Sequence, residues 1–405
     1  MTPDRMRAID CWLGIPLCAV LTAWRRLLSW VGQTSPAPPS RVLFIELAEM
    51  GSTVLACPAI RRLQQRHPGC EVFFLGFTNV APGVAVLGLV PGDRVWTIDP
   101  RSPWSLLRDT IRFLFQARRQ RIDTVINLEA FTRFSTLLAY ASGARTRVGF
   151  HGFGQAGLYT GDLLTHRVLY NPHIHTWQSF AALVEALDRP AGESPLCKTT
   201  PDTDAWVPRI ESDTAGEARG RRVLAEAGCR LEGGRRLVLV NPNASKLISI
   251  RKWPLANYAA LVSRLLEDED LWVGITGVAE KGEDARTILE TVRSDRVVDL
   301  TGRTSLRELI DVYNLASLLV TNDSGPAHFA SLTGIHVMVF FGPETPALYG
   351  PLARRRTVMY SGLACSPCVS AYNQRVTTCQ DNQCLKTIGV DAAYQAAKAA
   401  LGGRQ

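Results

Sequence analysis

One stretch of the sequence combines helix-capping side chains, a glycine and a histidine directly after an apolar run. Residues 321–328 are Thr-Asn-Asp-Ser-Gly-Pro-Ala-His. Asp323 or Ser324 can cap a helix that begins here, and Gly325 lets a ligand come close to the backbone. The N–H groups and the dipole of a helix N-terminus attract anions such as a diphosphate. The alternative is an ordinary helix cap without a ligand, in which His328 has a structural role.

A second loop carries positive charge between an apolar run and a predicted helix. Residues 241–253 include Ser245, Arg251 and Lys252, and Pro254 follows at a position that favours the first turn of a helix. Cations beside such a turn can neutralise phosphate charge. A solvated basic loop is the alternative.

A third loop, residues 46–52, brings two carboxylates to the end of the first apolar run. Gly51 permits close approach of a ligand, with Ser52 next to it. Glu46 or Glu49 could act as a general base that takes a proton from an acceptor hydroxyl. Solvated charges are the alternative.

Four cysteines gather near the C-terminus. Their spacing could hold a structural zinc ion in a tetrahedral site, or they could be reduced thiols in a folded loop. The residues are Cys365, Cys368, Cys379 and Cys384. The other six cysteines are scattered, so we expect a reducing compartment and no disulfide framework.

Short apolar runs alternate with amphipathic segments twice along the chain. This pattern predicts two α/β domains, each a parallel sheet covered by helices on both faces. The predicted strands are 42–47, 72–75, 95–98, 124–128 and 147–149, then 237–241, 271–275, 297–300, 318–321 and 337–341. The predicted helices are 53–66, 104–118 and 133–142, then 254–267, 280–293, 304–314 and 325–333.

The predicted organisation has three parts. Residues 1–40 form a membrane-associated segment and a linker, 41–210 a first domain, and 211–405 a second domain. The proline-containing stretch 188–212 separates the two halves. Ligands of such sheets bind at the carboxyl ends of the strands, which is where the three loops described above lie.

The N-terminal segment has the composition of a membrane anchor. Residues 11–24 are apolar, but a span needs about 20 residues. Arginines and tryptophans flank the run, which suits the headgroup level of an anionic leaflet. We therefore expect an interfacial or re-entrant anchor at the inner face of a membrane. A signal peptide or a helix packed on the core is the alternative.

The overall charge of +8 and the pI of about 9.1 favour anionic partners. The basic residues are spread along the whole chain instead of being concentrated with aromatic residues, so we expect no nucleic-acid binding.

At these residues the chain resembles glycosyltransferase family 9, which contains the lipopolysaccharide heptosyltransferases. The resemblance runs from about residue 41 to residue 390, and its pieces occur in the family's order. They are RVLFIELAEMGSTVLACPAIRRL, DTVINLEAF, RVGF, VLVNPNAS with RKWP, LTGRTSLRELIDVYNLASLLVTNDSGPAHFASLTG, FFGPETP and CSPC with CQDNQCL.

The resemblance implies a GT-B fold, in which two Rossmann-like αβα domains face each other across a cleft. It also implies an ADP-sugar donor, a lipid-linked saccharide acceptor and an inverting mechanism that requires no metal. The first domain then binds the acceptor and the second the nucleotide sugar. The expected function is transfer of heptose or a related sugar in cell-envelope lipopolysaccharide synthesis.

Carried over by position, the resemblance assigns most of the donor site. Asp323, Ser324 and Gly325 should hold the diphosphate and the sugar. Arg251 or Lys252 matches the family's phosphate-binding lysine. Residues 302–306, with Gly302 and Thr304, should lie by the base, and Glu280 or Glu283 near the ribose.

The chain departs from the family at the expected catalytic base. The family's first loop commonly has Met-Gly-Asp, whereas this chain has Met50, Gly51 and Ser52. A serine hydroxyl does not deprotonate an alcohol at neutral pH, so Glu49, or else Glu46, is the predicted base. The departure leaves two alternatives open: a GT-B enzyme that uses a UDP- or GDP-sugar, and a catalytically degenerate nucleotide-binding membrane protein.

Overall fold

The computed structural model describes residues 3–28, 38–152, 158–190, 193, 198, 204–244 and 246–402. Two compact units make up the chain, Met1–Trp206 and Val207–Gln405. Ser245, most of the predicted linker at 32–40 and much of the stretch at 188–212 lie outside the described residues.

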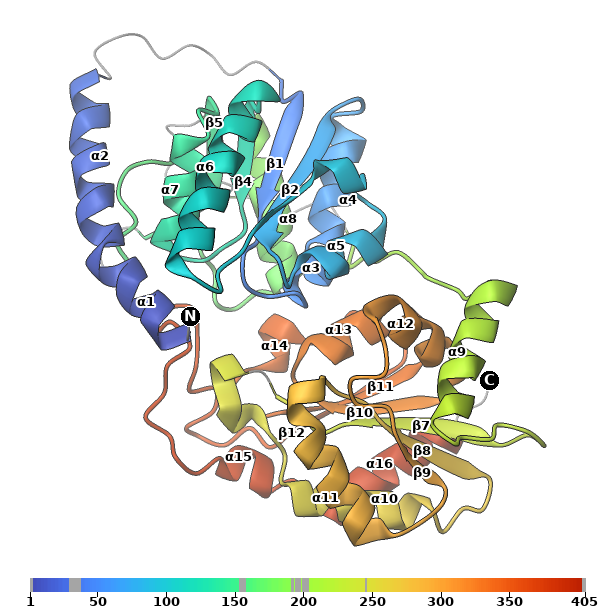
Figure 1. Cartoon of the computed structure of the whole chain (residues 1–405). Coiled ribbons are helices and arrows are strands. Elements are labelled where there is room, and N and C mark those ends of the chain that lie inside the picture. Colours follow the sequence, from blue (N-terminus) through green and yellow to red (C-terminus); the bar gives the residue numbers. More distant parts are fainter. Residues whose placement is uncertain are drawn as a thin grey trace. The chain divides into compact units, whose positions relative to one another are not determined.

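The first unit is built on a six-stranded parallel sheet in the order β3-β2-β1-β4-β5-β6 (Figure 1). Its strands are β1 (Arg41–Ile45), β2 (Glu71–Phe77), β3 (Val95–Ile98), β4 (Thr124–Asn127), β5 (Thr146–His151) and β6 (His166–Leu169). Its helices are α1 (Pro3–Trp12), α2 (Gly14–Leu28), α3 (Ser52–Leu55), α4 (Cys57–Arg66), α5 (Ala81–Leu87), α6 (Pro103–Arg119), α7 (Arg133–Ala141) and α8 (Thr176–Glu185).

The second unit repeats the same topology, with the strand order β12-β11-β10-β7-β8-β9. Its strands are β7 (Arg236–Asn241), β8 (Leu271–Ile275), β9 (Val297–Asp299), β10 (Leu318–Asn322), β11 (His336–Phe341) and β12 (Arg356–Tyr360). Its helices are α9 (Thr214–Glu226), α10 (Leu255–Leu265), α11 (Gly282–Val292), α12 (Leu306–Leu315), α13 (Gly325–Ala330), α14 (Pro346–Tyr349), α15 (Gln383–Lys386) and α16 (Val390–Gly402).

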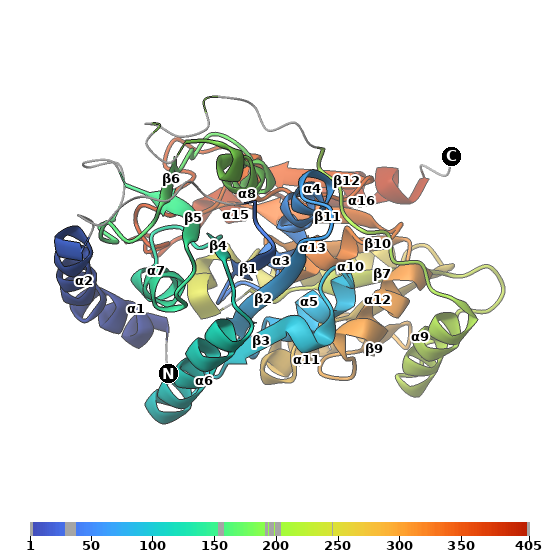
Figure 2. The same cartoon turned by 90° about the horizontal axis from the view of Figure 1, so that it is seen from above.

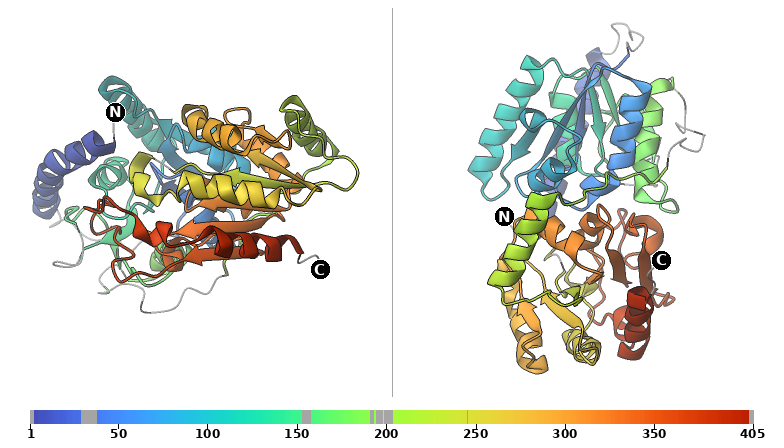
Figure 3. Two further views of the ribbon diagram at one scale, coloured as in Figure 1. Left: turned by 90° about the horizontal axis from the view of Figure 1, so that it is seen from below. Right: turned by 90° about the vertical axis from the view of Figure 1, so that its right-hand side faces the viewer.

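Helices cover both faces of each sheet. In the first unit, α6 and α7 lie on one face and α4 and α8 on the other (Figure 2). In the second unit, α10 and α16 lie side by side along one face (Figure 3) and contact each other, while α9 and α12 contact each other. Because both faces are covered, the central strands are buried along almost their whole length, as in β1 and β10.

The prediction of two Rossmann-like αβα domains is confirmed, and several of the elements that the prediction lacked lie at the edges of the sheets. β6 and β12 are edge strands, in which some side chains are exposed. A half-exposed edge strand lacks the continuous apolar run by which the other strands were recognised. Helices α5, α8, α9 and α16 were also not predicted, and the predicted helix at 53–66 is divided into α3 and α4.

The N-terminal helices pack on the first unit through small residues. Gly14, Cys18 and Thr22 are buried at four-residue spacing, and a Cβ on Gly14 would lie 2.7 Å from Cβ of Arg133. The Thr22 hydroxyl accepts a hydrogen bond of 2.8 Å from the Asp162 N–H. The proline at position 16 falls in the first turn of α2, so its missing N–H breaks no hydrogen bond within α2.

Candidate active site

The strand order of each sheet defines one place where the loops diverge. In the first unit the chain runs outward from β1 to β3 and then returns to β4 on the other side of β1. In the second unit it runs from β7 to β9 and returns to β10 beside β7. The crevice at such a switch point is the usual ligand site of an open parallel sheet. The loops after β1 and β4, and those after β7 and β10, are therefore the candidate sites.

Asn322, at the end of β10, joins the two loops of the second unit. Its Oδ1 accepts a hydrogen bond of 2.9 Å from the Trp253 N–H. Its Nδ2 donates to the carbonyl oxygens of Pro242 and Asn243, at 3.0 and 3.2 Å. Asn322 is fully buried, so these bonds fix the basic loop against the end of β10.

Two cation–carboxylate pairs stand in these loops. Nη1 of Arg251 lies 3.2 Å from Oδ2 of Asp323, and both side chains are largely buried. Nζ of Lys252 lies 2.5 Å from Oδ1 of Asp284, whose Oδ2 accepts a hydrogen bond of 2.9 Å from Asn243. Burial raises the pKa of the Asp323 carboxyl, and the charge and hydrogen bond of Arg251 oppose that shift. The arginine and the lysine are thus held in fixed positions before any ligand binds.

A third carboxylate, Glu344, is buried beside Asp323 and was missed by the sequence analysis. It follows β11 in the loop FFGPETP and is 1% exposed. Burial and then the charge of Asp323 raise the pKa of Glu344 to about 8, against the influence of Arg251. Nε of Arg375 lies 3.7 Å from its Oε1. A glutamate between apolar residues and prolines gave no periodic signal by which it could have been found.

The helix N-terminus predicted to bind the diphosphate is present. Ser324 occupies the N-cap position of α13. Its hydroxyl donates a hydrogen bond to the Asn322 carbonyl oxygen, so the side chain does not cap the helix. A Cβ on Gly325 would meet no heavy atom within 4 Å. His328 is buried, with 7% of its surface exposed.

The residues assigned to the base and the ribose lie on neighbouring loops of the same unit. Gly302 has φ +70°, and a Cβ there would lie 2.8 Å from Cβ of Ala279, so close backbone packing requires this glycine. Thr304 is partly exposed, and Glu280 and Glu283 are exposed. Among the acidic residues of this segment it is Asp284, which was not predicted, that pairs with Lys252.

In the first unit, the loop after β1 places Glu49 next to Ser52. The Ser52 hydroxyl donates a hydrogen bond of 3.1 Å to Oε2 of Glu49. Glu46 is buried, and its Oε1 accepts from the Glu49 N–H at 3.4 Å. The serine that replaces the family's aspartate therefore contacts the carboxylate that we predict to be the base.

Glu129, in the loop after β4, binds the loop after β1 and was not predicted. Its Oε1 accepts hydrogen bonds from the N–H groups of Leu47 and Ala48, at 2.8 and 3.3 Å. Its Oε2 accepts from the Thr132 hydroxyl at 3.2 Å. Burial raises the pKa of Glu129, while these hydrogen bonds oppose the shift. A bond across the switch point depends on strand order, which the sequence pattern did not specify.

The four cysteines near the C-terminus are not grouped as metal ligands among the described residues. Within the described part of the chain, no group of three or more His, Cys, Asp or Glu is placed to hold a metal ion. Cys365, Cys368, Cys379 and Cys384 are free thiols. Burial and the nearby thiols raise the pKa of Cys384, so it stays protonated at neutral pH. The structure therefore shows no placed ligand set for the predicted structural zinc, and that zinc stays a prediction.

Comparison with known proteins agrees with the fold. Residues 111–377 match the model of glycosyltransferase family 9 (heptosyltransferase). The chain is 30% identical to lipooligosaccharide heptosyltransferase 2 of Haemophilus influenzae, over 78% of this chain and 88% of that enzyme. It is 24% identical to lipooligosaccharide heptosyltransferase 2 of Campylobacter jejuni over 42% of this chain, a match that spans only about half (52%) of that protein.

A solved structure, the ADP-heptose lipopolysaccharide heptosyltransferase II of E. coli, has the same fold. Its TM-score is 0.68 at 18% identity, and the alignment covers 89% of this chain and 98% of that one. Two open parallel sheets of this topology define an α/β protein of the GT-B type. The chain belongs to glycosyltransferase family 9. The predicted family and fold class, and the prediction that the chain belongs to a class of glycosyltransferases, are confirmed.

Proposed function

We propose that the chain transfers heptose or a related sugar from an ADP-sugar to a lipid-linked saccharide of the cell envelope. The observation that carries this proposal is the pair of fixed cations, Arg251 and Lys252, beside the N-terminus of α13 at the switch point of the second sheet. The name of the E. coli structure, which includes ADP-heptose, supports the choice of donor. The heptosyltransferase relatives support the choice of sugar and pathway.

The proposed reaction is a single in-line displacement at the anomeric carbon. Glu49 takes the proton from an acceptor hydroxyl as that oxygen forms the new glycosidic bond. The bond from the anomeric carbon to the diphosphate oxygen breaks, and ADP leaves with its bonding electrons. Arg251, Lys252 and the N–H groups at Ser324 and Gly325 stabilise the charge that develops on the diphosphate. No metal is required in this scheme.

The carboxylates of the donor site have separate proposed roles. Asp323 and Asp284 hold Arg251 and Lys252 in place and so reduce the reorganisation that binding requires. Below about pH 8 the Glu344 carboxyl is protonated, so it adds no negative charge that would repel the diphosphate. A neutral carboxyl can also donate and accept hydrogen bonds with sugar hydroxyls.

Because the proposed acceptor is lipid-linked, we propose that the enzyme works at a membrane. We assign α1 and α2 to the cytoplasmic face of the inner membrane as an interfacial anchor. Residues Arg5–Leu27 have the length and mean hydropathy (1.4) that crossing a membrane needs, a test that core helices and signal sequences also pass. The contacts of Asp10, Thr22 and Arg25 with the first unit favour a helix that lies on the surface.

Calorimetric titration of the full-length protein with ADP, UDP and GDP tests the donor. We expect ADP to bind most tightly, and Arg251→Ala to weaken ADP about tenfold or more, because it removes a charged hydrogen-bond donor. Arg286→Ala, which changes an exposed arginine on α11 of the same unit, is the matched control and should leave the affinity unchanged.

Each alternative has its own outcome in that titration. A preference for UDP or GDP would keep the fold and overturn the ADP-sugar donor. Binding of none of the three would favour a member of the family that has lost its reaction. ADP binding without turnover of ADP-heptose and a lipopolysaccharide precursor would favour a catalytically degenerate nucleotide-binding protein.

A further inference from the structure

Exposed apolar side chains are concentrated on three helices of the first unit. Among the described residues, eleven of the sixteen large hydrophobic side chains that are exposed belong to the segments of α1, α2 and α6. Scattered single apolar residues are normal on protein surfaces, but a concentration of this kind marks an interaction surface.

Helix α6 carries an apolar stripe on the side opposite its buried face. Trp104, Leu107, Ile111 and Phe115 are 74%, 52%, 46% and 71% exposed, and their spacings of three and four residues place them on one side of the helix. The buried face of α6 contains Phe113 and Ala117, which belong to the core of the first unit. A helix that is apolar on two opposite sides needs a second partner besides its own sheet.

The α1–α2 segment has a similar stripe. The backbone bonds from Leu13 N–H to Ile9 and from Leu17 N–H to Leu13 continue the helix across the junction. Six exposed apolar residues follow spacings of three and four along it: Ile9, Leu13, Leu17, Val20, Trp24 and Leu27. Trp12, 80% exposed, lies next to this stripe.

The back of the α1–α2 segment is polar and attached to the first unit. Asp10 accepts hydrogen bonds from the N–H groups of Arg133 and Phe134, the first two residues of α7, and pairs with the Arg133 guanidinium at 3.2 Å. Arg25 pairs with Asp162 at 3.2 Å. Crossing a bilayer would break these contacts and leave charges in hydrocarbon, so the segment fits a position parallel to a membrane surface.

Helix α7 connects the two stripes. It contacts α1, α2 and α6, so these four helices lie on the same side of the first sheet (Figures 1 and 2). None of the residues of α7 is fully exposed. The stripes of α1–α2 and α6 therefore flank the same covered helix within one unit.

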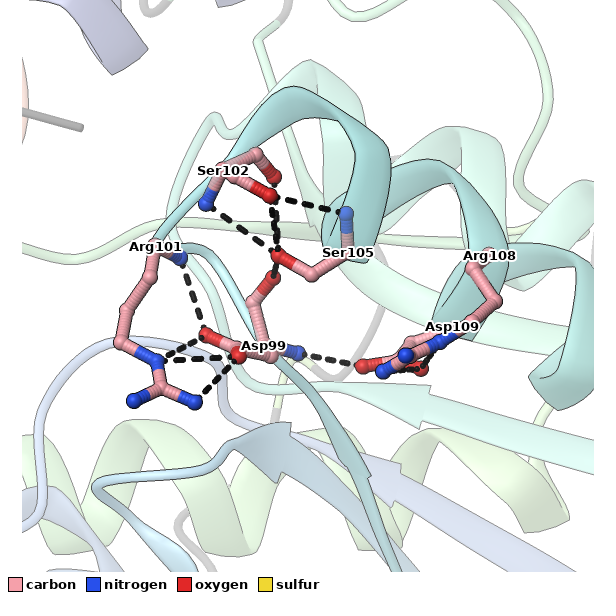
Figure 4. A network of polar contacts seen from close by, with 6 residues as sticks. All are labelled: Asp99, Arg101, Ser102, Ser105, Arg108 and Asp109. Atoms are coloured by element: carbon pink, nitrogen blue, oxygen red, sulfur yellow. Dashed lines mark hydrogen bonds and ion pairs between the residues drawn. The ribbon is translucent and has the colours of Figure 1, made fainter.

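The charges around α6 are basic. Arg112, Arg118 and Arg119 are exposed on the helix itself. The two carboxylates at its beginning are each paired with an arginine: Oδ2 of Asp99 lies 2.8 Å from Arg101, and Oδ1 of Asp109 lies 2.9 Å from Arg108 (Figure 4). A reciprocal capping box between Ser102 and Ser105 fixes the start of the helix. Acidic charge on this surface is thereby neutralised, while exposed arginines remain.

We propose that the stripes of α6 and α1–α2 together form one docking face for an anionic lipid bilayer. Tryptophan and phenylalanine enter the headgroup boundary, and the arginines at the sides of the stripes contact lipid phosphates. A second copy of the chain is the competing occupant, but flanking arginines on both copies would repel each other, whereas anionic lipid attracts them. The inference extends the membrane location proposed above and is independent of the transfer reaction.

Flotation of the full-length protein with lipid vesicles tests this docking face. The vesicles contain phosphatidylcholine alone or mixed with phosphatidylglycerol. We expect the wild type to bind the mixed vesicles more strongly than the neutral ones, and added salt to weaken binding. Trp104→Glu/Phe115→Glu should lower the partition coefficient about tenfold or more, because two large apolar side chains no longer enter the interface.

Two further variants test whether a loss of vesicle binding comes from the lost apolar contact, from the added charge or from misfolding. Gln64→Glu/Gln65→Glu adds the same two negative charges at exposed positions of α4, on the opposite face of the sheet, and should bind vesicles nearly as the wild type does. Trp104→Ser/Phe115→Ser adds no charge and should give an intermediate loss. ADP affinity, measured in parallel, should stay unchanged in all of these variants because α6 lies in the first unit.

The outcomes of these experiments separate the proposed membrane location from the proposed docking face. If the wild type binds mixed vesicles and Trp104→Glu/Phe115→Glu binds equally well, α6 is not part of the face, while the membrane location stands. If the wild type fails to bind, both the location and the docking face are wrong. If the wild type is a dimer in solution and the glutamate variant is a monomer, a second copy covers α6, and the bilayer proposal is overturned.

Discussion

At the residue scale, position 52 is where the chain departs from the residue that the family commonly has. Ser52 contributes a hydroxyl where the family commonly has an aspartate, and it donates that hydroxyl to Glu49. A hydrogen bond of this kind orients the carboxylate. The substitution is thus consistent with a base that has moved three residues along the same loop.

Glu49→Gln should lower kcat about a hundredfold or more, because glutamine cannot accept the proton of the acceptor hydroxyl. Affinity for ADP should stay the same, since Glu49 lies in the first unit. The measurement is the steady-state release of ADP from ADP-heptose, together with ADP titration. Glu71→Gln, at the amino end of β2, is the control and should retain activity. Unchanged turnover in Glu49→Gln would refute the assignment of the base.

The raised pKa of Glu344 predicts that the stability of the fold depends on pH. Its pKa in the folded protein, about 8, is higher than the ordinary value of 4.5 because the side chain is buried and Asp323 is close. Between these two values the folded state binds a proton that the unfolded state has released. The contribution to stability is therefore complete below pH 4.5 and is lost as pH rises to about 8.

Glu344→Gln should remove this dependence. From about pH 5 to about pH 8, the free energy of unfolding of the wild type should fall relative to that of the variant, by at most ~1.4 kcal/mol per pH unit for one proton. Urea unfolding of both proteins at several pH values measures the difference. A difference that does not vary with pH would mean that Glu344 is ionised in the folded protein.

At the scale of elements, α7 receives its N-terminal cap from another helix. Thr132, at the N-cap position, makes no side-chain capping bond, and the carboxylate of Asp10 in α1 accepts from the first two N–H groups instead. The α1–α2 segment is therefore part of the folded first unit, and α7 depends on it.

Asp10→Ala should lower the stability of the first unit by about 3 kcal/mol, because it leaves the buried Arg133 without its ion pair and α7 without its cap. Urea unfolding followed by circular dichroism measures the change. Asp93→Ala, at an exposed position of the same unit, should change stability by less than about 0.5 kcal/mol. Equal stability of the two variants would mean that α1 is not docked on α7 in solution.

At the scale of the whole molecule, two units of the same topology carry different chemistry. The first has glutamates at its switch point and the second has cation–carboxylate pairs. A ligand that binds one unit should therefore stabilise that unit in particular.

ADP should raise the unfolding temperature of the wild type, with about 2.7 kcal/mol of stabilisation at a free concentration of 100 times Kd. Hydrogen exchange should slow in residues 242–253 and 323–330 and stay unchanged in 46–52. Arg251→Ala at the same ADP concentration should show a much smaller shift. Protection confined to the loop after β1 would place the nucleotide in the first unit and reverse the roles of the two units.

The sequence by itself determined the repeated α/β pattern and the loops at the strand ends. Central strands such as β1 and β10 are buried on both faces, so they are continuous apolar runs that a local pattern reveals. Asp323, Arg251 and Glu49 lie in loops that directly follow such runs, and the family resemblance then gave them roles.

Only the tertiary structure decided which loops meet. Strand order depends on contacts far apart in the chain, and it alone brings Glu129 to Leu47 and Asn322 to Trp253. The burial that raises the pKa of Glu344 likewise comes from residues distant in sequence. The exposed stripe of α6 has the same local periodicity as a buried one, so its exposure followed only from the packing of the opposite face on the sheet.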